Sequence, residues 1–251
     1  MRSLLHRTIW LAAAPAVAAT LLLPPSGRAM AQALADQLAT CKRDNGAEST
    51  RIAACGWVID NAGDDDDIRI EALLQRGVLR ESADDREGAL ADYGKVIELD
   101  PTNAVAHFNR GNVHDRMGDQ ARALADYTQA IKLDPSDSDA YNNRGQVYDA
   151  MGEYDLAIAD FTESIRLNRD NPRAYFNRGL AYANKGEPEK AIASFDQAIK
   201  LDPKDADAYW SRGSLYEELD NEEAARADYR RALEIDPNHE DAKEGLARLE
   251  N

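Results

Sequence analysis

Cysteine is scarce in this chain of 251 residues, which has only two. Two thiols cannot build a disulfide-rich scaffold or a zinc site with four thiolate ligands. Basic residues are in the minority, because 30 Lys and Arg stand against 46 Asp and Glu and give a net charge of −16. That charge repels phosphate backbones and disfavours nucleic acid as a partner. Hydrophobic residues make up 43% of the chain, which is enough for a folded core.

Long apolar runs are absent except near the N-terminus, where residues 9–23 form a run of fifteen mostly apolar residues. Arg2 and Arg7 precede the run, and a small-x-small sequence ends at Ala31. This arrangement is typical of a secretory signal peptide, so we predict that residues 1–31 are one and that the mature protein is exported. An uncleaved membrane anchor is the alternative, although the run falls short of the ~20 residues that span a bilayer.

A period of 34 residues organises most of the remaining sequence. Each unit contains two stretches of helical periodicity separated by a turn, and a proline after the second stretch ends that helix. One helix pair cannot bury its apolar stripe alone, so the pairs must stack. The recurring residues are a glycine (Gly77, Gly111, Gly145, Gly179, Gly213), an alanine (Ala89, Ala123, Ala157, Ala191, Ala225), an aromatic residue (Tyr93, Tyr127, Phe161, Phe195, Tyr229) and a proline (Pro101, Pro135, Pro203, Pro237, with Arg169 at the remaining position).

This pattern resembles the tetratricopeptide repeat (TPR) family, in a form typical of exported bacterial proteins. The resemblance implies an all-α fold, an α-solenoid in which antiparallel helix pairs stack into a right-handed superhelix with a concave groove. Residues 240–251 carry a weak apolar stripe and are predicted to form a helix that caps the last repeat. The family positions match five repeats, residues 70–103, 104–137, 138–171, 172–205 and 206–239.

Residues 32–69 are predicted to form a degenerate helix pair followed by an acidic linker. Residues 51–59 copy the pattern of a second helix, and residues 34–43 would be its first helix. Cys55 and Cys41 would lie on these antiparallel neighbours, and an oxidising compartment favours a disulfide between them. Two free buried thiols are the alternative. The four successive aspartates of residues 64–67 lack the alternating ligands of a calcium loop.

Signatures of catalysis are missing from the sequence. It has no glycine-rich phosphate loop, no nucleophile elbow and no H-E-x-x-H motif. His107 and His114 share a helical face, but tyrosine fills their positions in three other repeats, so we expect them to pack rather than to bind a metal. The prediction is a protein that is not an enzyme and that uses neither a cofactor nor a metal.

An arginine precedes the repeated glycine in every unit, and in four units an aspartate follows it sixteen residues later. We predict an ion pair between the two helices of these repeats. The fourth repeat has Arg178 and Ser194 instead, so Arg178 is expected to use another carboxylate. The predicted pairs are Arg76–Asp92, Arg110–Asp126, Arg144–Asp160 and Arg212–Asp228.

The family resemblance implies that exposed residues of the first helices line the groove. Side-chain amides there can pair with a peptide backbone, and aromatic side chains can supply apolar anchors; packing between first helices is the alternative for the aromatic side chains. Phe108 and Asn177 replace two cations with which some family members clamp a terminal carboxylate, so that specificity is not expected. The candidate groove residues are Leu74, Phe108, Asn109, Asn112, Asn142, Asn143, Arg173, Phe176, Asn177 and Trp210.

The sequence therefore predicts a non-catalytic, exported TPR scaffold that binds a protein or peptide in its concave groove. Acidic residues near the groove favour a neutral or basic ligand. The periplasm is the expected location, and secretion is also compatible. The alternative function is an envelope-complex assembly or self-association factor that acts through convex or terminal surfaces. No stable membrane insertion is expected once the signal peptide has been cleaved.

Overall fold

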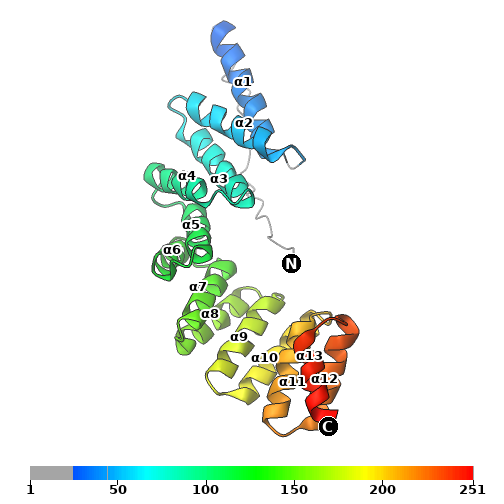
Figure 1. The fold of residues 1–251 in the computed structure, drawn as a ribbon. Coiled ribbons are helices and arrows are strands. Elements are labelled where there is room, and N and C mark those ends of the chain that lie inside the picture. The colour runs from blue at the N-terminus through cyan, green and yellow to red at the C-terminus, as the bar shows by residue number, and fades with distance from the viewer. Residues whose placement is uncertain (1–24, 44, 251) are drawn as a thin grey trace. The chain divides into compact units, whose positions relative to one another are not determined.

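The computed structural model describes residues 25–43 and 45–250 of the chain. Those residues form thirteen α-helices and no β-strand (Figure 1), so the predicted all-α class is confirmed. Most of the predicted signal peptide lies outside the described residues, and only its last seven residues are part of the first helix. Within the described part, no helix is both long and apolar enough to cross a membrane.

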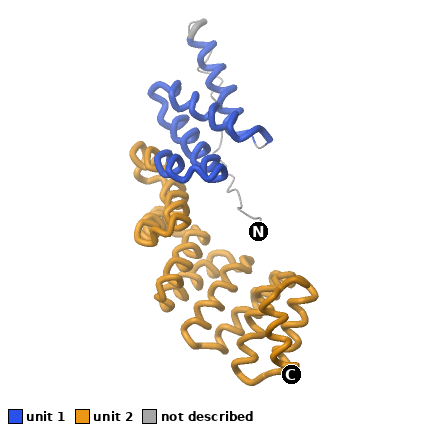
Figure 2. The backbone as a smooth tube through the Cα atoms, viewed as in Figure 1, with its two compact units in different colours: residues 1–92 blue, residues 93–251 orange. Residues whose placement is uncertain are grey.

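Two compact units divide the described helices (Figure 2). The first unit ends at Asp92 and the second begins at Tyr93, so the boundary falls inside helix α4. The first unit contains α1 (Pro25–Lys42), α2 (Glu48–Asn61), α3 (Asp66–Ser82) and half of α4 (Arg86–Leu99). The second unit continues with α5 (Ala104–Arg116), α6 (Gln120–Leu133), α7 (Ser138–Ala150), α8 (Tyr154–Leu167), α9 (Pro172–Asn184), α10 (Pro188–Leu201), α11 (Ala206–Glu218), α12 (Glu222–Ile235) and α13 (Glu240–Glu250).

Helix pairs are the building block of the second unit. The pairs α5–α6, α7–α8, α9–α10 and α11–α12 make the most extensive contacts. Each second helix except α12 also packs on the first helix of the next pair, as α6 does on α7 and α8 on α9 (Figure 1). Stacked pairs of this kind are an α-solenoid, as predicted.

Every first helix of the second unit starts at a capping side chain. The side-chain oxygen of each cap accepts a backbone N–H of the first turn, which satisfies a donor that has no partner within the helix. Helix α8 ends at Leu167 even though Arg169 replaces the proline there, because the next residue, Asn168, has an extended backbone. The caps stand 34 residues apart at Asn103, Asp137, Asn171 and Asp205.

The turn between the two helices of a repeat requires a left-handed residue. Gly118, Gly152 and Gly186 have φ angles of 77° to 79°, which glycine adopts without steric cost. At the same position of the first and fifth repeats, Asp84 and Asp220 have φ angles of 60° and 59°. Aspartate tolerates this conformation better than most residues, so the turn persists without glycine.

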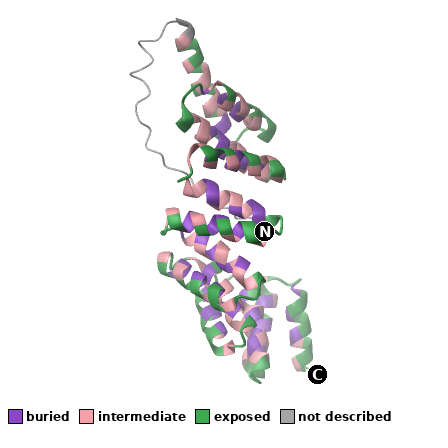
Figure 3. Ribbon diagram, turned by 90° about the vertical axis from the view of Figure 1, so that its left-hand side faces the viewer, coloured by how far each residue is buried: buried purple, intermediate pink, exposed green. Residues whose placement is uncertain are grey.

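The repeated glycine of the first helix lies directly against the aromatic ring of the second. A Cβ at Gly145 would stand 2.8 Å from the ring of Phe161, and one at Gly179 would stand 2.7 Å from Phe195. Both rings are only 1% exposed. Buried residues lie where helices face each other (Figure 3), so the close approach that glycine permits is part of the core.

Replacing Gly145 by alanine should therefore destabilise the second unit. The added methyl must displace the buried ring of Phe161, which costs about 1–3 kcal/mol. Gly94 is the matched control, because it lies within α4 with no atom within 4 Å of an added Cβ. Gly94→Ala should stabilise the helix by up to about 1 kcal/mol. Urea unfolding measures both, and a Gly145→Ala variant as stable as the wild type would contradict the packing.

Helix α13 covers the last pair and packs on α12 and α11. A Cβ at Gly245 would stand 2.6 Å from the ring of Tyr229, while Leu246 packs against the same buried cluster. At the other end of the contact, Nε and Nη2 of Arg248 donate to the carboxylate of Glu217 in α11, each at 3.0 Å. The helix thereby shields the apolar face that a further repeat would cover.

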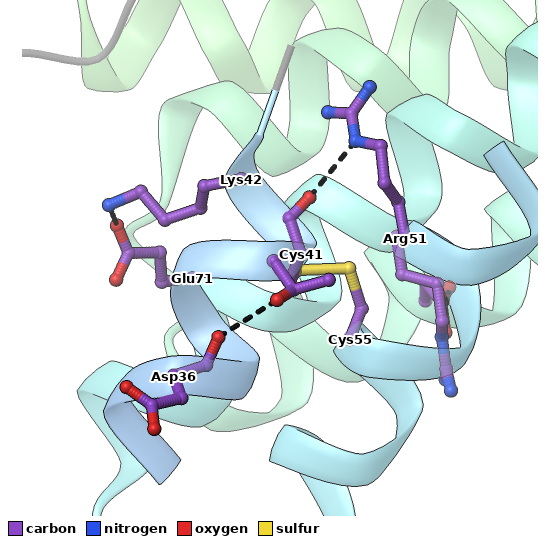
Figure 4. Close-up of a disulfide and its surroundings, with 9 residues drawn as sticks. Asp36, Cys41, Lys42, Arg51, Cys55 and Glu71 are labelled. Atoms are coloured by element: carbon purple, nitrogen blue, oxygen red, sulfur yellow. Dashed lines mark hydrogen bonds and ion pairs between the residues drawn. A yellow bond between two sulfur atoms is a disulfide. The ribbon is translucent and has the colours of Figure 1, made fainter. Parts of the chain in front are cut away.

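A disulfide joins the first two helices of the first unit (Figure 4). It connects Cys41 at the end of α1 to Cys55 in α2, as the sequence predicted. Both cysteines are fully buried, and they form a cluster with Ala54 and Leu79 of α3. Lys42 pairs with Glu71 of α3 beside the disulfide.

The predicted acidic linker is mostly the start of a helix. Asp65 caps α3 by accepting the backbone N–H of Ile68 at 3.1 Å. Asp66 and Asp67 lie in the first turn of α3, where negative charge complements the helix dipole. Helix α3 thus begins four residues before the predicted repeat boundary at residue 70.

Reduction of the disulfide should destabilise the first unit. A bridge over a separation of 14 residues contributes about 3 kcal/mol in the chain-entropy model. We expect reductant to lower the free energy of unfolding of the wild type by about this amount and to leave a Cys41→Ala/Cys55→Ala variant unchanged. Two reactive thiols in the unfolded, unreduced protein would show that the bridge is absent.

Candidate functional site

Four asparagines on three consecutive first helices form one hydrogen-bonded chain. Nδ2 of Asn143 in α7 donates to Oδ1 of Asn112 in α5 at 2.9 Å. Asn142, also in α7, donates to Oδ1 of Asn143 at 3.2 Å and accepts from Nδ2 of Asn177 in α9 at 3.0 Å. The hydroxyl of Tyr127 also donates to Oδ1 of Asn112, at 2.8 Å. We call Asn112, Asn142, Asn143 and Asn177 the asparagine ladder.

The two ends of the asparagine ladder offer opposite hydrogen-bonding groups. Among the described residues, neither Nδ2 of Asn112 nor Oδ1 of Asn177 has a partner. Both side chains are partly exposed, whereas Asn142 is only 2% exposed. One end can therefore donate a hydrogen bond to a ligand and the other can accept one, while Asn142 has an internal, positioning role.

The three candidate aromatic anchors are partly exposed and partly packed. Phe108 contacts the buried cluster that contains Val147 of α7, and Phe176 contacts the one that contains Leu215 of α11. Their packing and ligand-binding roles are thus compatible, because each ring is held by the protein and still presents surface. The ring contacts are Phe108–Tyr127, Phe176–Phe195 and Trp210–His239, with centroids 6.0, 5.5 and 5.7 Å apart.

The remaining candidate groove residues differ in exposure. Leu74 belongs to the first unit and is buried at 9% exposure, so its side chain is core. Asn109 in α5 is partly exposed, and Arg173 at the start of α9 is exposed. The structure places Asn109 and Arg173 on the same helices as the asparagine ladder but shows no hydrogen bond from their side chains to it.

Two acidic side chains accompany the asparagine ladder on α5 and α7. Burial raises the pKa of Asp115 and, equally, the pKa of Asp149. Nδ2 of Asn184 in α9 donates to both carboxylate oxygens of Asp149 at 3.3 Å, a bond that opposes this rise. Carboxylates that are partly withdrawn from water would gain from a basic neighbour and repel an acidic one.

The predicted ion pairs between the helices of a repeat are confirmed in four repeats. In each pair the arginine donates from Nε and Nη2 to the two carboxylate oxygens, at 2.6 to 2.9 Å. The hydrogen bond from Arg144 to Asp160 raises the pKa of the guanidinium. In the fourth repeat, Nε of Arg178 donates only to Oγ of Ser194, at 3.3 Å. The other carboxylate expected for Arg178 is not found among the described residues.

The two histidines of the second repeat pack around Asp126. Nδ1 of His107 lies 3.3 Å from Oδ1 of Asp126, and Nε2 of His114 lies 3.9 Å from Oδ2. Both histidines are 8% exposed, and desolvation lowers the pKa of His114. Across the described ranges, no three His, Cys, Asp or Glu side chains are arranged to hold a metal ion.

Comparison with known proteins identifies the repeats. A family model described as "Tetratricopeptide repeat" matches residues 108–172, 142–205 and 178–240, and one described as "TPR repeat" matches residues 85–118. None of the curated proteins compared with the chain matches it.

Solved structures share the fold over most of the chain. A crystal structure of MamA is 28% identical with a TM-score of 0.61, covering 68% of this chain and 96% of MamA. YrrB, described as a TPR protein with an unusual peptide-binding site, is 26% identical with a TM-score of 0.66, covering 78% of this chain and 99% of its own. A tetratricopeptide repeat protein from Parabacteroides merdae, at 19% identity and a TM-score of 0.66 over 88% of this chain and 100% of its own, shows the fold alone.

Sequence reasoning missed the hydrogen bonds of the asparagine ladder. Asn109, Asn143 and Asn177 stand 34 residues apart, and that recurrence was a signal that their side chains lie on one face. The bond between Asn142 and Asn177 joins different positions of neighbouring repeats. Only the stacking of the helix pairs brings those two side chains together.

The arginine–aspartate pairs make a coupling prediction. Arg144→Leu leaves the buried carboxylate of Asp160 unpaired, which should cost about 3–5 kcal/mol, and adding Asp160→Leu should recover part of that loss. Arg178→Leu is the matched control, because no carboxylate loses its partner, and its cost should be at most about 1 kcal/mol. Urea unfolding of the four proteins of the cycle measures the coupling, and strictly additive effects of the two leucines would contradict it.

Proposed function

The chain belongs to the tetratricopeptide repeat family, and we propose that it is an exported, non-catalytic scaffold that binds a protein or peptide along the first helices of its second unit. TPR proteins mediate protein–protein interactions and are generally non-catalytic. The observation that carries the proposal is the asparagine ladder, since it arranges polar groups along α5, α7 and α9 where a ligand can reach its two ends.

A peptide backbone satisfies the chemistry of these ends. Each peptide unit has one N–H donor and one C=O acceptor. A backbone carbonyl of the ligand can accept from Nδ2 of Asn112, and a backbone N–H can donate to Oδ1 of Asn177. The internal bonds of the ladder hold the amides of Asn142 and Asn143 in fixed orientations, so less conformational entropy is lost on binding.

Apolar anchors stand on the same helices as the ladder. Phe108 is in α5 and Phe176 is in α9, each braced by a buried ring of its own repeat. A few aromatic side chains usually contribute most of the affinity at an interface. Binding is therefore expected to combine backbone hydrogen bonds with one or two apolar side chains of the ligand.

The charge around the ladder favours a neutral or basic ligand. Asp115 and Asp149 lie on α5 and α7, and the whole chain carries a net charge of −16. Phe108 and Asn177 stand where a clamp for a terminal carboxylate would place cations. We therefore propose recognition of a peptide backbone rather than of an acidic chain end.

Export is proposed from two independent features. The N-terminal residues 1–31 have the composition of a signal peptide, and the disulfide between Cys41 and Cys55 suits an oxidising compartment. The periplasm is the proposed location, and secretion from the cell is compatible with the same features. Fractionation of cells that express the full chain tests this proposal, which requires the shortened protein to leave the cytoplasm.

Binding is tested with peptides selected from a random library of twelve residues on the wild-type protein. The variant Asn143→Ala/Phe176→Ala breaks the ladder and removes one ring, so its affinity for the selected peptides should fall at least about tenfold, which corresponds to about 1.4 kcal/mol. The selected peptides should not carry net negative charge.

The matched control removes an amide and an apolar side chain from second helices. Leu156 in α8 is 47% exposed, and Gln197 in α10 is exposed, so Leu156→Ala/Gln197→Ala should bind as the wild type does. Circular dichroism checks that both variants are folded. Equal binding by the two double variants would contradict the proposed site, and binding lost only in the control would move it to the second helices.

A further inference from the structure

Four repeats of the chain share one nearly buried carboxylate position. It lies between the first and second helices, and the arginine of the first helix grips it with Nε and Nη2. The aspartate side chains at this position are only 3% to 9% exposed. The fold thus creates a site for a carboxylate group once in each of these repeats, which are the first, second, third and fifth.

The fourth repeat keeps the arginine and lacks the carboxylate. Nε of Arg178 donates to Oγ of Ser194 at 3.3 Å, longer than the 2.7 to 2.9 Å bonds that Nε makes to aspartate in the other repeats. Within the described residues, Nη2 of Arg178 has no hydrogen-bond acceptor. The hydroxyl of Ser194 donates to the carbonyl of Lys190 at 3.0 Å, so it cannot supply a negative charge.

The guanidinium of Arg178 is nevertheless held in the position of its counterparts. Its Cζ lies 5.5 Å from the ring centroid of Tyr175, as Cζ of Arg144 lies 5.7 Å from that of Tyr141. The side chain is only partly exposed, and Ser194 beneath it is 1% exposed. Arg178 therefore presents the same fork of donors without having to move into place, which lowers the cost of binding.

Electrostatics and size define what fits there. A cation that is partly removed from water gains from a negative partner, and a guanidinium fork matches the two oxygens of a carboxylate. Serine is shorter than aspartate by the width of a carboxyl group, so only a slender anion can enter between the helices. A small monocarboxylate, with formate as the smallest example, has both the charge and the shape.

We propose that the fourth repeat binds a small monocarboxylate anion between Arg178 of α9 and Ser194 of α10. Its two oxygens accept hydrogen bonds from Nε and Nη2 of Arg178, as the carboxylates of Asp160 and Asp228 do in their repeats. This site is independent of the proposed peptide binding, because it uses the side of α9 that packs on α10. Asn177 meets α7 from another side of the same helix.

Unfolding of the full chain in chloride-free buffer tests the site. Sodium formate is compared with sodium gluconate, whose anion is too bulky to enter, at equal ionic strength. When formate stands ten times above its dissociation constant, the unfolding equilibrium constant of the wild type should fall about tenfold. A direct readout is the broadening of the formate proton signal in NMR spectra on addition of the protein.

Three variants separate a specific site from a general salt effect. Ser194→Asp supplies the carboxylate covalently, so the variant should be more stable than the wild type and insensitive to formate. Arg178→Leu should also lose the formate response. Asp160→Ser recreates the arrangement of the fourth repeat in the third, so it should be less stable than the wild type and respond more strongly to formate.

The outcomes decide the proposal in either direction. Loss of the formate response in both Ser194→Asp and Arg178→Leu supports it, even if Asp160→Ser fails to fold. Equal responses of the wild type and these two variants would show a general effect of formate and overturn it. No difference between formate and gluconate in the wild type, together with an unbroadened formate signal, would mean that water alone satisfies Arg178.

Discussion

The contact on which the structure depends is the close approach of the two helices within each repeat. A glycine in the first helix lies against a buried ring of the second, and the Cβ of any other residue would collide with that ring. Bringing the helices this close also places an arginine of the first helix within reach of an aspartate on the second. The ion pair and the packing contact are therefore two consequences of one geometry, repeated every 34 residues.

Stacking of the pairs then creates the surface with which the chain meets other molecules. The asparagine ladder exists because α5, α7 and α9 lie close enough for side-chain amides to bond from one repeat to the next. Those bonds fix the amides and leave a donor at one end and an acceptor at the other. The proposed peptide site thus inherits its rigidity from contacts between repeats, while Arg178 and Ser194 depend on contacts within a repeat.

The sequence predicts what a single repeat dictates and fails where neighbouring repeats decide. The helix pairs, the left-handed Gly118 and the pair of Arg144 with Asp160 follow from residues of one repeat, and all were predictable. The bond from Asn177 to Asn142 was not, because it depends on the offset between stacked pairs. The left-handed Asp220 was also missed, since aspartate adopts that conformation here only because the flanking helices impose it.

The most direct test of the account follows the side-chain amide signals of the asparagines by NMR while a library-selected peptide is added. The account predicts that the largest shifts belong to Asn112 and Asn177, whose amide groups would bond to the peptide, with a smaller shift for the internal Asn142. Unchanged asparagine signals together with shifts confined to residues of α8, α10 and α12 would contradict it, because the peptide would then occupy the second helices.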